Sequence, residues 1–172
     1  MAQPLAGKDG KLTEAIIRRA RLEDATDLQR HCYPEASLDD VRDYLAWCLA
    51  QEKKGRIVRL VAEVDSKVVG NAQLTVWGQA GEIGSVVVSE DFRRRGLARQ
   101  LIMVLLDKAR RRGLERAEIE VAQDQPAILA FYRRLGFQPV GEEENGPLPS
   151  THPRPTILLQ MQLFASSPQR GK

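Results

Sequence analysis

Several features that would narrow the function at once are missing from this sequence. It has only two cysteines, Cys32 and Cys48, and their spacing matches no metal-binding motif. A free cysteine packs as a small hydrophobic side chain, so we interpret both as structural thiols. No apolar run is long enough to span a bilayer, and no signal peptide is recognisable. We therefore expect no metal, no membrane contact and a cytoplasmic location.

Charge of one sign is also scarce. The 26 Lys and Arg residues against 23 Asp and Glu residues leave a formal net charge of only +3. This is too little for binding nucleic acid over the whole surface, so any anion site must be local. Aromatic residues are not interleaved with the arginines, as single-strand binding would require. We expect no nucleic-acid partner; the alternative predicts a steeply salt-dependent affinity for DNA or RNA.

What is present is typical of a globular domain. Hydrophobic residues make up 42% of the chain and charged residues 28%. A length of 172 residues suits one domain with a sizeable core. We expect a flexible N-terminal arm over residues 1–12, a single domain over residues 13–164 and a disordered tail over residues 165–172.

Hydrophobic periodicity, caps and turn residues predict the order of the elements. The expected strands cover residues 13–19, 56–64, 68–77, 82–89, 116–121, 137–141 and 155–163. The expected helices run from Asp24 to Cys32, between Ser37 and Gly55, and over residues 97–112 and 126–135. The strands that begin at Glu82 and Arg116 are joined by a helix, so they should be parallel. This predicts an α/β fold: a mixed, mostly antiparallel sheet with a central parallel βαβ unit and helices on both faces.

The stretch VVVSEDFRRRGLARQL, residues 86–101, is a candidate anion site. It passes from a strand into a helix, and a helix start presents unpaired N–H groups and partial positive charge. Gly96 lets the backbone come close to a ligand, and Arg93, Arg94, Arg95 and Arg99 surround it. The spacing fits neither a dinucleotide fingerprint nor a P-loop. Taken alone, a basic turn with a glycine hinge remains an alternative.

Three motifs follow one another in order along the second half of the chain. Val86-Val87-Val88 precedes the arginine stretch, Ile119-Glu120-Val121 forms the next strand, and AFYRRLGF, residues 130–137, closes the next helix. With the Arg-x-x-Gly-x-Ala stretch they resemble the GNAT superfamily of acetyl-CoA-dependent N-acetyltransferases. The resemblance covers residues 13–163 in element order and 82–137 in motif. The sequence departs from the family pattern at Glu90, where proline is usual, and at Gln125, where asparagine is usual.

The resemblance implies a binding site for acetyl-CoA as cosubstrate. The backbone of Val86, Val87 and Val88 would meet the pantetheine arm as an added strand does. Backbone N–H groups and arginines at the start of the helix would hold the pyrophosphate. The candidate cofactor-binding residues are Val86, Val87, Val88, Arg93, Arg94, Arg95, Gly96, Leu97, Ala98, Arg99 and Gln125.

Acetyl transfer to an amine sets two chemical requirements. The amine, with a pKa of about 10.4 for a lysine-type ammonium, must lose a proton, and the departing thiolate must gain one. The resemblance makes Tyr132 the proton donor; a core tyrosine is the alternative. Glu120 and Glu82 are candidate bases, and we expect both to be partly buried because apolar strand residues flank them. Solvent-facing side chains and a base acting through water stay open as alternatives.

The function implied is an N-acetyltransferase that moves an acetyl group from acetyl-CoA to a primary amine of a peptide, protein or small molecule. Direct attack in a ternary complex, without a metal, is the expected mechanism. A non-catalytic acyl-CoA-binding regulatory domain is the alternative. Many family members pair through their last strands, so a homodimer stays open. The loops around residues 31–37 and 142–155 carry no readable code for the acceptor.

Overall fold

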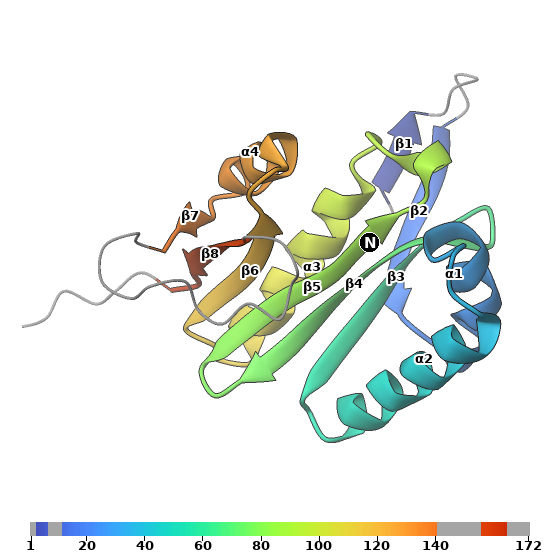
Figure 1. Cartoon of the computed structure of the whole chain (residues 1–172), viewed down its shortest axis with the longest axis horizontal. Coiled ribbons are helices and arrows are strands. Elements are labelled where there is room, and N and C mark those ends of the chain that lie inside the picture. Colours follow the sequence, from blue (N-terminus) through green and yellow to red (C-terminus); the bar gives the residue numbers. More distant parts are fainter. Residues whose placement is uncertain (1–2, 7–11, 141–155, 165–172) are drawn as a thin grey trace, which may run out of the picture.

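The structure, a computed structural model, describes residues 3–6, 12–140 and 156–164. Its strands form one sheet in the order β1-β2-β3-β4-β5-β6-β8-β7 (Figure 1). Neighbouring strands are antiparallel except β5 and β6, which are parallel. The strands are β1 (Gln3–Ala6), β2 (Leu12–Arg19), β3 (Ile57–Val64), β4 (Lys67–Trp77), β5 (Ala80–Val88), β6 (Arg116–Ala122), β7 (Gln138–Pro139) and β8 (Thr156–Gln162). The expected mixed sheet with a parallel βαβ unit is confirmed.

Helices cover both faces of the sheet (Figure 1). They are α1 (Ala25–Cys32), α2 (Leu38–Lys53), α3 (Leu97–Arg111) and α4 (Pro126–Arg134), with short 3-10 turns η1 (Leu22–Asp24) and η2 (Glu90–Phe92). Side chains alternate along β3: Leu60 packs in one buried cluster with Leu101 of α3, whereas Val61 packs with Leu28 of α1. Tyr132 of α4 belongs to the α3 cluster. We call the two sides the α1/α2 face and the α3/α4 face.

Local sequence signals account for most of the element boundaries. The Ser37 hydroxyl accepts a hydrogen bond of 3.1 Å from the Asp40 N–H, which caps α2 as expected. Asp65 and Ser66 have φ values of 49° and 61°, the left-handed conformation that a tight two-residue hairpin between β3 and β4 requires. Gly96 begins α3 at the predicted position.

The structure differs from the sequence expectations at three elements. Part of the expected N-terminal arm, β1, pairs antiparallel with β2, because edge pairing uses backbone groups and needs no hydrophobic pattern. Asp24 does not cap α1; its carboxylate accepts the Arg21 N–H at 2.7 Å and closes η1. The strand expected over residues 137–141 is only two residues long and ends at Pro139, which has no N–H to donate.

The expected tail and most of the loop before β8 lie outside the described residues. Within the described residues, no helix is both long and apolar enough to cross a bilayer.

One irregularity opens the middle of the sheet. Parallel pairing between β5 and β6 stops after Glu82 and Glu118, although each strand continues with its other neighbour. Beyond that row the two strands separate (Figure 1). On the other edge of β5, Gln73 lies opposite Gly84 but Asn71 lies opposite Val87, so β5 carries one extra residue there. This bulge and the separation that follows it create the space described next.

Candidate active site

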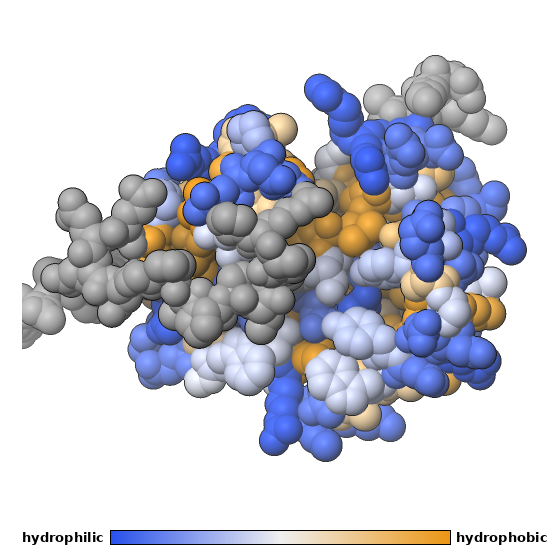
Figure 2. Space-filling view, viewed as in Figure 1, coloured by the Kyte–Doolittle hydropathy of each residue, from blue (hydrophilic) through white to orange (hydrophobic). Residues whose placement is uncertain are grey.

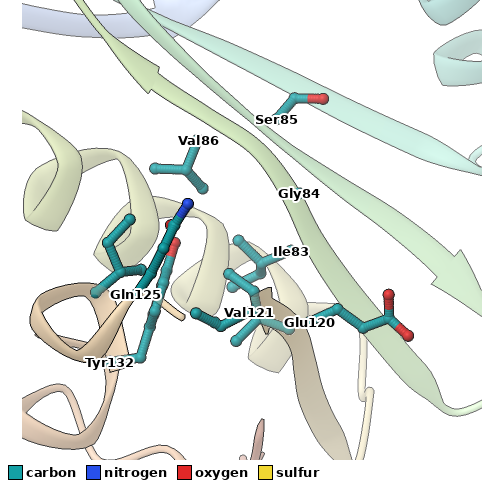
Figure 3. A pocket seen from close by; sticks show the side chains of 10 residues that line it. Ile83, Gly84, Ser85, Val86, Glu120, Val121, Gln125 and Tyr132 are labelled. Atoms are coloured by element: carbon teal, nitrogen blue, oxygen red, sulfur yellow. The ribbon is translucent and has the colours of Figure 1, made fainter. Parts of the chain in front are cut away.

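A cavity of about 200 Å³ lies where β5 and β6 separate (Figure 3). Its walls come from the bulged part of β5, the end of β6 and the first turns of α4. The lining residues are Ile83, Gly84, Ser85, Val86, Ile119, Glu120, Val121, Gln125, Ile128 and Tyr132. In Figure 2, apolar surface is visible in the recess between α4 and the hydrophilic loop that leads into α3. The cavity therefore offers a slender guest both apolar and polar contacts.

Tyr132 is the buried polar group of this cavity. Its side chain is 5% exposed and packs edge-on against the rings of Phe131 and Phe137, with centroid distances of 5.1 and 5.8 Å. In Figure 3 it extends from α4 toward the gap that Val86 borders. Among the described residues, hydrogen bonds of tyrosine hydroxyls are found for Tyr33 and Tyr44, but not for Tyr132. Burial raises the pKa of Tyr132, so the hydroxyl stays protonated and available as a donor to a guest.

The two candidate bases lie in different places. Glu120 lines the cavity, but in Figure 3 its carboxylate points away from Tyr132. Glu82 is outside the lining, in the last paired row beside Glu118, and accepts a hydrogen bond of 3.0 Å from the Trp77 Nε1–H. Both are exposed, so the expectation of partial burial is wrong. Side chains alternate between the two sides of a strand. The apolar neighbours Ile83, Ile119 and Val121 therefore pack on the α3/α4 face, and the two carboxylates lie on the other side of the sheet.

The loop before α3 has the backbone conformation of an anion site. Arg94 and Gly96 both have positive φ, 62° and 83°, and Gly96 precedes the first turn of α3 without a side-chain cap. Alternating left-handed residues next to a helix start turn successive N–H groups toward one point. Arg93 donates from Nε to the Val88 carbonyl at 3.1 Å, and Arg95 donates to the Asp91 carbonyl at 2.9 Å. These two arginines brace their own loop.

Two further arginines remain for a ligand at this loop. Arg94 and Arg99 are exposed, and neither makes an ion pair with a residue that the structure describes. A fork-shaped guanidinium binds phosphate oxygens in pairs. Since Arg94 lies in the loop and Arg99 in the first turn of α3, both flank the open N–H groups.

The comparison with known families gives a decisive match. Residues 22–137 match the model of the acetyltransferase (GNAT) family. The chain belongs to the GNAT acetyltransferase family. This GNAT chain is 30% identical over 108 residues to the L-methionine sulfoximine/L-methionine sulfone acetyltransferase of Pseudomonas paraeruginosa. That match spans 60% of the chain and 63% of the relative's length.

Solved structures show the same fold. The ribosomal-protein-alanine N-acetyltransferase of Brucella melitensis superposes with a TM-score of 0.70 at 23% identity, covering 86% of this chain and 99% of that one. A Thermoplasma acidophilum N-acetyltransferase in complex with coenzyme A gives a TM-score of 0.69 at 15% identity, covering 86% and 98%. The expected family and fold are therefore confirmed.

The GNAT fold brings only part of the predicted site together. Glu120, Gln125, Tyr132 and Val86 line one cavity. The Val87 side chain packs toward the α1/α2 face instead. Val88, Leu97 and Ala98 belong to or border the α3/α4 core, so these residues can offer a ligand mainly their backbone.

Sequence reasoning missed four residues of the cavity wall. They are Ile83, Gly84, Ser85 and Ile128. One signal for them existed, because an isolated glycine inside a strand pattern indicates a bulge or a close approach. For metal binding, the described part of the chain holds no group of three or more His, Cys, Asp or Glu side chains close enough to share an ion.

Proposed function

We propose that this chain is an N-acetyltransferase that transfers the acetyl group of acetyl-CoA to a primary amine in a ternary complex. The observation that carries this proposal is that Tyr132, a side chain only 5% exposed, lines a cavity between separated strands. The strand that forms one wall, β5, leads through the arginine-rich loop into the start of α3, where we place the pyrophosphate. A thioester and a pyrophosphate can therefore be held along one continuous path.

The coenzyme would lie along β5. From Ile83 onward the edge of β5 that faces β6 has no ladder partner among the described residues, so its backbone groups could pair with the amides of pantetheine. The N–H groups around Gly96 would receive the pyrophosphate, with Arg94 and Arg99 as cationic contacts. Gln125, exposed at the cavity edge, would contact the same arm from α4.

The reaction requires one proton transfer to the departing sulfur and others away from the amine nitrogen. The neutral amine nitrogen attacks the thioester carbonyl carbon, the C–S bond breaks, and the sulfur takes a proton from Tyr132. The second proton that the nitrogen loses as the amide forms returns to the Tyr132 oxygen. The proton lost by the ammonium goes to Glu120, the candidate base that lines the cavity. Since the Glu120 carboxylate points away from Tyr132, we propose that a water molecule carries this proton. Glu82 is the weaker candidate, because it lies outside the cavity lining.

The acceptor is the least defined part of the proposal. The Pseudomonas relative is named for a small amino-acid derivative and the Brucella neighbour for an alanine of a ribosomal protein. Both names are consistent with an acceptor that is a primary amine. We extend only this shared chemistry to the present chain, and expect it to act in the cytoplasm.

Two measurements test the proposal. Calorimetry should detect acetyl-CoA binding at one site, and an acceptor panel of amino acids, N-terminal peptides and polyamines should release free thiol. The matched variant is Tyr132→Phe, which keeps the ring packing; it should leave acetyl-CoA affinity unchanged and lower kcat by about 100-fold or more. Absence of acetyl-CoA binding contradicts the proposal. Binding without thiol release from any acceptor, with cellular function intact in Tyr132→Phe, favours the regulatory alternative.

A further inference from the structure

Arg59 is an unusual residue for the middle of a sheet. It lies on β3, is 2% exposed, and sits under α2 with the ring of Tyr44 5.2 Å from its guanidinium carbon. All of its hydrogen bonds within the described residues go to neutral groups. A buried cation without a carboxylate is costly, and a hydrocarbon of similar shape usually serves stability as well or better. The position of Arg59 therefore calls for a reason other than stability.

The guanidinium joins two residues of the neighbouring strand. One arm donates to the Gln73 Oε1 at 2.9 Å and the other to the Asn71 Oδ1 at 2.6 Å. Asn71 and Gln73 are alternate residues of β4 and share the α1/α2 face with Arg59. The planar guanidinium thus bridges two side chains that are neighbours on the same face of β4.

Asn71 and Gln73 are also the two residues that border the bulge. Gln73 lies opposite Gly84 and Asn71 opposite Val87, so three steps along β5 correspond to two along β4. Within this interval Ser85 has a φ of 50°, a conformation that a non-glycine residue keeps only when its surroundings impose it. Gly84, Ser85 and Val86 are the part of β5 that lines the cavity.

Further contacts orient the Gln73 amide. The Tyr44 hydroxyl and the Cys48 thiol also donate to Oε1, at 3.4 and 3.3 Å, and Nε2 donates to the Thr75 hydroxyl at 3.1 Å. The Tyr33 hydroxyl donates to the Asn71 Oδ1 at 3.0 Å. Each carbonyl therefore keeps another donor if the guanidinium is removed.

We propose that Arg59 is a positioning residue: its fork fixes Asn71 and Gln73 and so holds the β5 bulge, and with it the cavity wall, in the geometry that acetyl transfer requires. This inference rests on the function proposed above for the cavity. Arg59 touches neither coenzyme nor acceptor in this arrangement. It acts through β4 on the backbone of residues 84–87.

The decisive variant is Arg59→Met, which fills the space without charge or fork. Because both carbonyls keep a donor, we expect the thermal midpoint to be unchanged or higher. We expect kcat to fall at least tenfold and the backbone amides of residues 84–87 to exchange faster with solvent. Arg59→Lys, which keeps the charge but not the fork, should show the same two effects.

Arg18→Met is the matched control. Arg18 lies on β2, on the same face of the sheet, and pairs with Asp24 and Glu63 at 2.7 Å each. Its loss leaves the nearly buried Asp24 carboxylate without its guanidinium, so the thermal midpoint should fall while kcat per folded molecule and exchange at residues 84–87 stay unchanged.

Three outcomes would contradict the positioning role of Arg59. The first is that Arg59→Met keeps the kcat and the amide exchange of the wild type, and the second is that Arg59→Lys keeps full activity. The third is that kcat falls in proportion to stability, to the same extent, in both Arg59→Met and Arg18→Met. Amide exchange needs no turnover, so it tests the effect of Arg59 on the bulge even if the wild-type protein transfers no acetyl group. Absence of acetyl transfer by the wild type would contradict only the proposed function.

Discussion

At the scale of single residues, two glutamates that look equivalent in the sequence have different surroundings. Both sit on strands between apolar residues, and both are exposed. Glu120 lies beyond the last row in which β5 and β6 are paired, where the strands have separated. Glu82 lies within that row and accepts a hydrogen bond from Trp77. The point at which the strand pairing ends therefore decides which carboxylate borders the cavity.

This difference predicts unequal effects of two matched substitutions. Glu120→Gln should lower kcat about 100-fold near neutral pH, the usual contribution of a general base, with recovery at high pH as the free amine fraction rises. Glu82→Gln removes the same charge outside the cavity and should change kcat less than about threefold. The pH profiles of kcat for both variants provide the measurement. If Glu82→Gln lowered kcat more than Glu120→Gln, Glu82 and not Glu120 would be the general base.

At the scale of elements, the loop before α3 is the part of the site that local sequence describes best. The glycine at the helix start, the arginines around it and the following amphipathic helix are all neighbours in the chain. Periodicity and capping rules act over this same range, so they could place Gly96 and the start of α3 correctly. Which arginines bond within the loop and which stay exposed for a ligand could not be predicted from these local rules. Arg93 and Arg95 bond to carbonyls whose positions depend on the folded loop.

Gly96 allows a controlled test of this loop. An added Cβ would meet no atom within 4 Å, but the φ of 83° is strained for any other residue, so Gly96→Ala should cost about 1–2 kcal/mol of stability. It should also weaken acetyl-CoA binding, because the methyl group would stand where we propose that the backbone meets the pyrophosphate. Gly113→Ala, at the other end of α3 with a φ of 72° and equally open space, is the control.

Unfolding curves and acetyl-CoA titrations of the two variants separate strain from ligand contact. Both variants should lose similar stability, and only Gly96→Ala should lose affinity. Equal acetyl-CoA affinities in the two variants would show that the pyrophosphate does not approach this backbone.

At the scale of the whole molecule, the sheet separates two buried clusters, and each contains a titratable group that burial affects. Burial raises the pKa of the thiol of Cys32, the last residue of α1, from its usual value near 9 to about 11. Burial also raises the pKa of Tyr132 on the opposite face. Both groups are neutral in the folded and unfolded chain at neutral pH. Their effect on stability therefore appears only in alkaline solution.

The sign of this effect follows from proton binding. Above about pH 9 the unfolded chain releases the Cys32 proton while the folded protein retains it, so the free energy of unfolding should fall as pH rises toward 11. A shift of two pKa units corresponds to at most about 3 kcal/mol. Urea unfolding between pH 8 and 11 measures the decline, to which Tyr132 adds above about pH 10.

Cys32→Ala is the variant for this test. It should make the decline between pH 9 and 11 less steep. The part that remains comes from Cys48, Tyr44 and Tyr132, because burial raises the pKa of each of these groups as well. An identical slope in the wild type and Cys32→Ala would assign the alkaline loss to other groups.

The sequence by itself determined the order and type of the elements from β2 onward, the glycine at the start of α3 and the position of Tyr132 on α4. These features depend on periodicity, caps and turn residues, which act between near neighbours. Only the tertiary structure decided where β5 bulges, where it leaves β6, and which glutamate borders the resulting cavity. The contact of Arg59 with Asn71 and Gln73 belongs to the same group. All of these depend on the register between strands, and a single inserted residue such as Ser85 changes that register without leaving a periodic signal in the chain.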